Sequence, residues 1–354
     1  DPAAPYLDHP RTFALQEPVI AALHDLLGHH GIQPLHMLSG RGHHLVWKVQ
    51  RTSEAFKSLC ALGHLPQGVE AYYKKNPVHQ GVVVDTDLAR AYAGVGMILE
   101  YVTGQVILMA GPHCAIPVTI SDIEVRPRHQ GQESISIDVS EYSDPLNTRM
   151  IRIAFSVYSK AMEFKDNRNG LELLHFIPRF GMEIGSALNV MHSPEQTCRL
   201  AEHSSVAIPD FSPQTQDLVE AYGKSRLARF HRFFYSREQQ PPQCWPQTYD
   251  QWVVHEVPRS MLPLFTSPGR KLLRPATMQL VVRILYGLGW HPQDIAGFIR
   301  SKFERDHQWG EEWDFYNPAT RADFYARALS GAIASGVDCI EDLEWQACRS
   351  RGSD

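Results

Sequence analysis

The sequence lacks several features that would place it in a class at once. Its 354 residues include six cysteines but no Cys-x-x-Cys pair, which argues against a disulfide framework and against a zinc ribbon. No internal repeat and no low-complexity tract is found. The formal net charge of −5 gives no overall basic character, so any argument for nucleic-acid binding has to rest on local patches. The scattered cysteines favour a reduced, cytoplasmic setting.

A long uninterrupted apolar run is also missing. The most apolar stretch, residues 92–111, contains Glu100, Thr103 and Gln105. These polar residues favour a buried amphipathic helix running into a strand over a membrane span, so we expect no membrane partner. No signal peptide is visible. The chain opens with Asp1 and not with Met, so we expect residues translated before Asp1 to be missing from it.

The remaining composition is that of a globular protein with a sizeable core, 43% hydrophobic and 21% charged. Helical spacing of apolar residues predicts helices over 12–30 and 52–63. β-branched and alternating residues predict strands on either side of a turn in 34–48, and further strands in 104–111, 133–142 and 149–160. Helices mixed with strands indicate an α/β or α+β domain.

The second half of the sequence has a different pattern. After about residue 180 it is almost wholly helical, with a proline-marked break at 241–246 and amphipathic helices in 273–289, 291–306 and 321–336. We therefore expect a mixed domain over residues 1–190, a helical connector over 191–246 and a helical accessory domain over 247–354.

Ser39-Gly40-Arg41-Gly42-His43-His44 joins two of the expected strands. Its two glycines are free to take positive φ, and backbone N–H groups beside Arg41 and His44 could cradle an anion such as a triphosphate. A plain hairpin turn with surface histidines explains the same residues about equally well.

A second polar segment, residues 134–160, follows. It places Asp138 at the end of a strand and then Arg149, Arg152 and Lys160. A carboxylate at a strand edge suits a divalent metal ion, and the cations suit phosphate oxygens. An alternating strand with a solvated outer face is the simpler explanation of the two arginines.

The two segments together resemble the archaeo-eukaryotic primase superfamily, which includes primase small subunits and primase-polymerases. That family has a Ser-Gly-x-Gly-x-His turn between strands, then a strand ending in a metal-binding Asp, then a basic strand. The matching residues are Ser39, Gly40, Gly42, His44, Asp138, Arg149, Arg152, Phe155, Ser156, Val157 and Lys160. Ala154 and Tyr158 depart from the family, which usually has Pro and His there. The resemblance covers about residues 1–165.

The resemblance implies an α+β, RRM-like catalytic domain followed by an all-helical C-terminal domain. It also implies a DNA primase or polymerase that transfers nucleotides from NTP or dNTP to a 3′-hydroxyl, with Mg²⁺ or Mn²⁺ as cofactor. Asp138 and His44 would be catalytic. The nucleotide-binding residues would be Ser39, Gly40, Arg41, Gly42, His44, Arg149, Arg152 and Lys160. Expected partners are nucleoside triphosphates, a single-stranded DNA template and primer, and a helicase or another replication or defence protein.

The family also has an Asp-x-Asp upstream of the serine-glycine turn, which is not seen here. Asp1 is one candidate for its last member. Asp85 and Asp87 are another, although they follow the turn where the family pair precedes it. An exposed turn that caps the helix starting near Leu88 explains Asp85 and Asp87 without any metal. A metal site that is incomplete in this chain is the remaining possibility.

Residues 221–238 interleave cations with aromatic rings, a composition suited to single-stranded nucleic acid. The cations concerned are Lys224, Arg226, Arg229 and Arg232. A core face of rings opposite a solvated face of arginines is the favoured explanation.

The sequence leaves two functions open: a nucleotidyltransferase, or a non-catalytic module of the same fold that binds nucleotides or nucleic acid in plasmid replication or defence. A carboxylate triad near His44 would discriminate between them.

Overall fold

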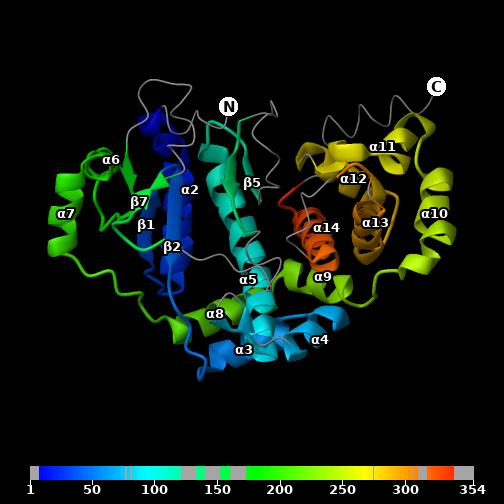
Figure 1. Cartoon of the computed structure of the whole chain (residues 1–354), viewed down its shortest axis with the longest axis horizontal. Coiled ribbons are helices and arrows are strands. Elements are labelled where there is room, and N and C mark those ends of the chain that lie inside the picture. Colours follow the sequence, from blue (N-terminus) through cyan, green and yellow to red (C-terminus); the bar gives the residue numbers. More distant parts are fainter. Residues whose placement is uncertain are drawn as a thin grey trace.

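The computed structural model of the chain describes residues 8–75, 78–79, 82–120, 133–139, 152–159, 173–273, 275–305, 307–309 and 317–338. Its architecture is α+β and mostly helical, with small sheets near the N-terminal helices and a wholly helical C-terminal region (Figure 1). These features agree with the expected class. Asp1, Arg149 and Lys160 lie outside the described residues.

The first part of the chain contains the serine-glycine turn together with all of the described strands and several helices. Its elements are α2 (His9–His29), β1 (Leu35–Ser39), β2 (Gly42–Val46), α3 (Glu54–Leu62), α4 (Gln67–Lys75), β3 (Val78–His79), β4 (Val82–Val83), α5 (Thr86–Ala110), η1 (Gly111–His113), β5 (Val118–Ile120), β6 (Ile135–Ile137), β7 (Val157–Tyr158), β8 (Leu174–His175) and β9 (Ile177–Pro178).

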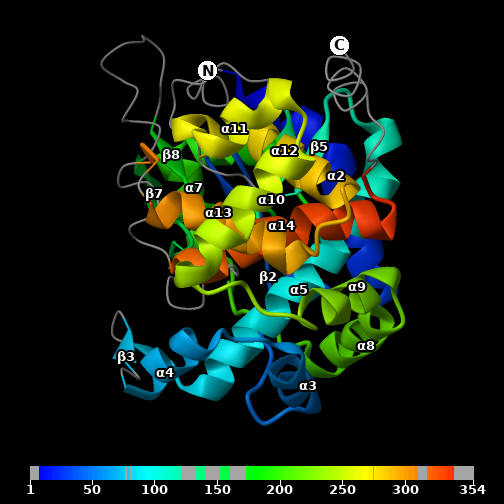
Figure 2. The ribbon, with the colours of Figure 1, turned by 90° about the vertical axis from the view of Figure 1, so that its right-hand side faces the viewer.

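Helices form the rest of the described chain. They are α6 (Ile184–His192), α7 (Pro194–Glu202), α8 (Ser212–Gly223), α9 (Arg226–Phe234), η5 (Pro242–Gln247), α10 (Tyr249–Glu256), η6 (Arg259–Met261), α11 (Leu262–Thr266), η7 (Gly269–Leu273), α12 (Pro275–Gly287), α13 (Pro292–Glu304) and α14 (Pro318–Ser335). The predicted helices in 12–30, 52–63, 273–289, 291–306 and 321–336 are confirmed, apart from small shifts at their ends. From the side, α10 to α14 lie in front of α5 (Figure 2).

Helix α5 runs through the middle of the molecule, between α2 on one side and α14 on the other (Figure 1). Our prediction of a strand at 104–111 is wrong, because the α-helix continues to Ala110. Val102, Val106 and Ala110 are buried at helical spacing, so packing overrides the local β-branched preference. By length and composition alone α5 could cross a membrane, yet 56% of its most apolar window is buried inside the protein.

A buried charged network fixes α5 to the helical region. Glu100 of α5 is paired with Arg327 of α14, whose Nε lies 3.0 Å from Oε1, and its Oε2 lies 3.0 Å from His231 Nε2 of α9. All three side chains are at most 8% exposed. Two tyrosines join the network: the Tyr222 hydroxyl contacts His231, and the Tyr235 hydroxyl accepts a hydrogen bond from Arg327. Burial alone would raise the pKa of Glu100, but the Arg327 and His231 side chains lower it.

The short strands around the serine-glycine turn form two small sheets, β2-β1-β9 and β7-β8, which are joined through residues 174–178. β1 pairs with β2 on one side and with β9 on the other, both antiparallel, with Leu38 opposite His43 and Ile177. β8 pairs with β7, and Phe155 donates its N–H to the carbonyl oxygen of Phe176, which lies between β8 and β9. The segment from 174 to 178 therefore connects β7 to β1. A separate parallel pair, β5 and β6, lies beside α5.

The buried network yields the first prediction. Arg327→Met should lower the free energy of unfolding by about 3–5 kcal/mol, because it leaves the Glu100 carboxylate buried without its cation. Arg199→Met is the matched control, since Arg199 and its partner Glu195 are 72% and 74% exposed, and it should cost less than about 1 kcal/mol. Urea unfolding measures both.

A double variant keeps this prediction decisive if Arg327→Met does not fold. Glu100→Met combined with Arg327→Met removes both charges and should recover part of the lost stability. Equal effects of Arg327→Met and Arg199→Met would show that the network adds no stability.

Candidate functional site

The serine-glycine turn is a two-residue hairpin between β1 and β2. Ser39 is directly opposite Gly42, and the Ser39 hydroxyl donates a hydrogen bond to the Gly42 carbonyl oxygen at 3.1 Å. Neither Gly40 nor Gly42 has positive φ, so the turn does not use the left-handed conformation that is open to glycine. Another constraint must explain the glycine at position 40.

That constraint is the ring of Tyr158. A Cβ added to Gly40 would lie 2.6 Å from two ring carbons of Tyr158 and 3.1 Å from a side-chain carbon of Leu174. Only a glycine leaves room for the ring. The turn from the first sequence segment and strand β7 from the second therefore lie in direct contact, as the sequence predicted for parts of one site.

Arg152 belongs to the same site. Its guanidinium carbon lies 4.9 Å from the centre of the Tyr158 ring, a cation–π contact, so the cation is held close to Gly40 by the ring between them. Tyr158 is one of the two residues that depart from the family pattern. Tyr158 thus serves as a platform that joins a cation to the turn.

His44 faces the opposite side of the hairpin from His43, by the alternation of side chains along β2. Its ring makes an edge contact with Phe176, with ring centres 5.5 Å apart. The protein atoms packed around His44 lower its pKa, and the negative charge of Asp138, directly after β6, opposes this by raising it. The structure therefore brings Asp138 into the electrostatic range of His44.

Asp85 and Asp87, two further expected metal ligands, have another role. Asp85 caps α5 by accepting a hydrogen bond from the Leu88 N–H at 2.8 Å, and it is also paired with Arg51. Asp87 lies in the first turn of the same helix. This is the capping role that the sequence allowed for them. In the described part of the chain, no group of three or more His, Cys, Asp or Glu residues is placed to hold a metal ion.

Three imidazoles form a hydrogen-bonded chain on the face of the hairpin that carries His43. This chain was not predicted from the sequence. His24 Nε2 lies 3.1 Å from His36 Nδ1, and His36 Nε2 lies 2.8 Å from His43 Nδ1. Strand alternation and a two-residue turn could have placed His36 and His43 on one face. Their contact with His24 depends on how α2 packs. Burial, followed by neighbouring positive charge, lowers the pKa of His36 to about 3 and that of His43 to about 2.

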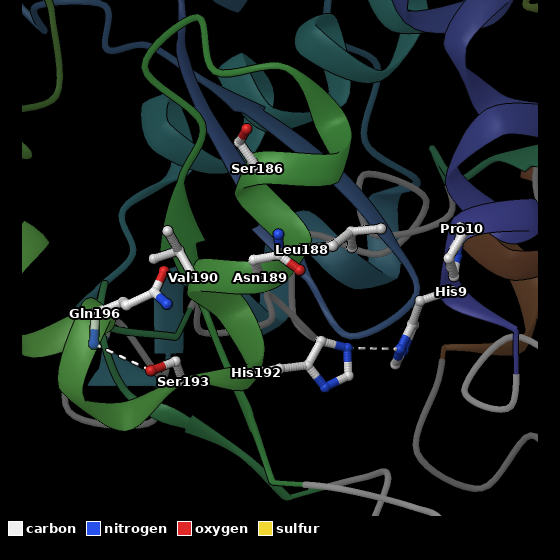
Figure 3. Close-up of a pocket in the computed structure, with 9 residues that line it drawn as sticks. All are labelled: His9, Pro10, Ser186, Leu188, Asn189, Val190, His192, Ser193 and Gln196. Carbon is white, nitrogen blue, oxygen red and sulfur yellow. Dashed lines mark hydrogen bonds between the residues drawn. The ribbon is translucent and has the colours of Figure 1, made fainter.

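A second histidine pair lies behind the turn. The buried His9 places Nε2 2.9 Å from the Gly40 carbonyl oxygen and Nδ1 3.1 Å from His192 Nε2. Figure 3 shows His9 and His192 meeting across a pocket between the start of α2 and helices α6 and α7. Sequence spacing gave no signal for this pair, because 183 residues separate its members.

In residues 221–238 the cations and most of the phenylalanine rings lie on different faces, as expected for a core face of rings opposite a solvated face of arginines. Phe230 and Phe234 are buried, at 6% and 0% exposure, so these rings belong to the core. Phe233 is 48% exposed. The four cations are on the exposed surface, namely Lys224, Arg226, Arg229 and Arg232. A charged surface is present there, but with one exposed phenylalanine ring and not several.

Comparison of the chain with protein-family models, with curated proteins and with solved structures gives no match.

The contact between Gly40 and Tyr158 gives a second prediction. Gly40→Ala should destabilise the protein by about 1–3 kcal/mol, because the added methyl group overlaps the ring. Gly42→Ala is the matched control, since its Cβ would meet only the Gln16 side chain, at 3.5 Å. Adding Tyr158→Ala to Gly40→Ala should remove the overlap. If the penalty in urea unfolding is the same with and without the ring, the close approach is not its cause.

The imidazole chain gives a third prediction. A histidine whose pKa is about 2 or 3 when folded and 6.5 when unfolded takes up protons on unfolding. Its contribution to stability is complete above pH 6.5 and is lost as the pH falls toward the folded pKa. Between pH 6.5 and pH 5, the wild type should lose about 2 kcal/mol more than His43→Phe. His255→Phe, at an exposed position, should retain the wild-type slope. Parallel slopes in all three proteins would contradict the lowered pKa values of His36 and His43.

Proposed function

We propose that the Ser39–His44 hairpin, Arg152 and Asp138 form the nucleotide site of a nucleotidyltransferase of the primase-polymerase class. The observation that supports this most is the contact of Gly40 with Tyr158, which joins the two sequence segments of the resemblance at one place. Two segments that match one family pattern only by chance would have no reason to meet in space.

The triphosphate would be bound by groups that differ in reach and charge. Arg152 supplies a permanent cation beside Tyr158, and the backbone N–H groups after Ser39 supply fixed dipoles. His44 supplies an imidazole whose charge responds to Asp138. Arg149 and Lys160 remain part of the proposed set on sequence grounds. Arg41 is exposed at the tip of the hairpin and would approach the outer phosphate.

The cofactor of such an enzyme is Mg²⁺ or Mn²⁺, which assists displacement at the α-phosphate when it is held by converging carboxylates. The described residues form no three-residue metal group, although the charge of Asp138 acts on the pKa of His44. The further carboxylates would have to come from other parts of the chain, with Asp1 as the candidate. The alternative function is a nucleotide-binding module of the same fold without catalysis.

In either case the expected polymer partner is single-stranded DNA, template and primer together. Its candidate contact is the group of exposed cations Lys224, which follows α8, and Arg226, Arg229 and Arg232 of α9. Such a contact would be sensitive to salt and tolerant of sequence. The proposed setting is cytoplasmic, alongside a helicase or another replication or defence protein.

The fourth prediction tests the site in two steps. His44→Ala and Arg152→Ala should each weaken ATP or dATP binding about tenfold or more, and the double variant should lose less than the sum because both groups contact one ligand. His255→Ala and Arg259→Ala, at exposed positions, serve as matched controls and should bind normally. Isothermal titration measures all five variants.

The second step separates the two functions. Primer extension with Mg²⁺ or Mn²⁺ should occur in the wild type and be lost in Asp138→Asn, whereas Asp25→Asn on the exposed face of α2 should remain active. Nucleotide binding without extension in the wild type would support the non-catalytic module. Normal binding by both His44→Ala and Arg152→Ala would overturn the site itself.

A further inference from the structure

The pocket behind the hairpin has no role in the proposed triphosphate site. Its volume is about 690 Å³, within the range of small-molecule sites. The first turn of α2 forms one wall, and α6 with the start of α7 forms the other (Figure 3). The residues that line it are His9, Pro10, Ser186, Leu188, Asn189, Val190, His192, Ser193 and Gln196.

The lining has no permanently charged side chain among the described residues and is rich in hydrogen-bonding groups. Among the described residues that line the pocket, none is Asp, Glu, Lys or Arg. Two carboxamides, Asn189 of α6 and Gln196 of α7, offer donors and acceptors in the lining, while Leu188 and Val190 supply apolar surface. A phosphate group would favour arginine or lysine in such a lining. A flat, neutral, heteroaromatic group suits it better.

Histidine tautomers connect this pocket to the hairpin. The Gly40 carbonyl oxygen can only accept, so His9 must donate from Nε2, and a neutral His9 then accepts at Nδ1. His192 Nε2 must therefore be the donor to His9. The orientation of the His192 ring in the pocket is thus fixed through His9 by the backbone of the nucleotide-binding turn.

We propose that this pocket binds the base of a second nucleotide, with adenine as its preferred base. Asn and Gln carboxamides form paired hydrogen bonds with adenine N6 and N7, which is the pattern that Asn189 and Gln196 can supply. The proposal extends the proposed function, since a second nucleotide beside the triphosphate site is what the start of a new strand requires. The base site can be tested without that function.

Adenosine is the probe, because it has no phosphate to bind at Arg152 or at the hairpin. Isothermal titration of the whole chain should show saturable adenosine binding and clearly weaker uridine binding. Asn189→Ala and Gln196→Ala should each weaken adenosine binding about fivefold or more. Gln251→Ala, at an exposed position of α10, is the matched control and should have no effect. Arg152→Ala should also leave adenosine binding unchanged.

Several results would overturn the inference. They are absence of saturable adenosine binding, equal affinity for uridine, or unchanged affinity in both carboxamide variants. Displacement of adenosine by inorganic phosphate would show that the pocket is an anion site instead. Loss of adenosine binding with normal ATP binding defeats this inference alone. If the wild type binds ATP no more tightly than adenosine, and His44→Ala and Arg152→Ala do not change ATP binding, the proposed triphosphate site alone is defeated.

Discussion

The pairing of Glu100 with Arg327 is the interaction on which the arrangement of the whole chain depends. A carboxylate in the middle of an apolar helix has to be neutralised or paired, because burying it unpaired costs several kcal/mol. Arg327 and His231 reach it from α14 and α9, so the central helix is attached to the C-terminal helices by charge as well as by packing. The position of α5 then determines where α2 packs, and α2 carries the histidines that contact the hairpin.

Much of the fold could be predicted from local pattern. Helical periodicity and caps located α2, α3 and the C-terminal helices, and a glycine-rich polar corner located the β1–β2 hairpin. The error at 104–111 has a physical cause. Isolated β-branched residues favour a strand, but their spacing continues the buried face of α5, and tertiary packing decided the outcome.

Less of the candidate site than of the fold could be predicted from the sequence. The types of residue in the hairpin and in β7 indicated that they would share a ligand, yet the reason for the glycine at position 40 is a ring 118 positions later in the chain. The imidazole chain and the His9–His192 pair depend on which faces of α2 and α6 meet the sheet, and no spacing rule contains that information. Contacts between distant segments are the part that a single sequence leaves open.

The Glu100–Arg327 pair also bears on how the protein is made. The two residues are separated by 227 positions. At a synthesis rate of about 5–20 residues per second, α5 leaves the ribosome about 10–45 s before its cation exists. During that interval α2, α3 and α5 can associate, but Glu100 has to remain hydrated, so the central helix can reach its final burial only after α14 has been translated. Translation speed through the second half of the chain therefore sets how long the apolar faces of the first half are exposed to aggregation and to chaperones.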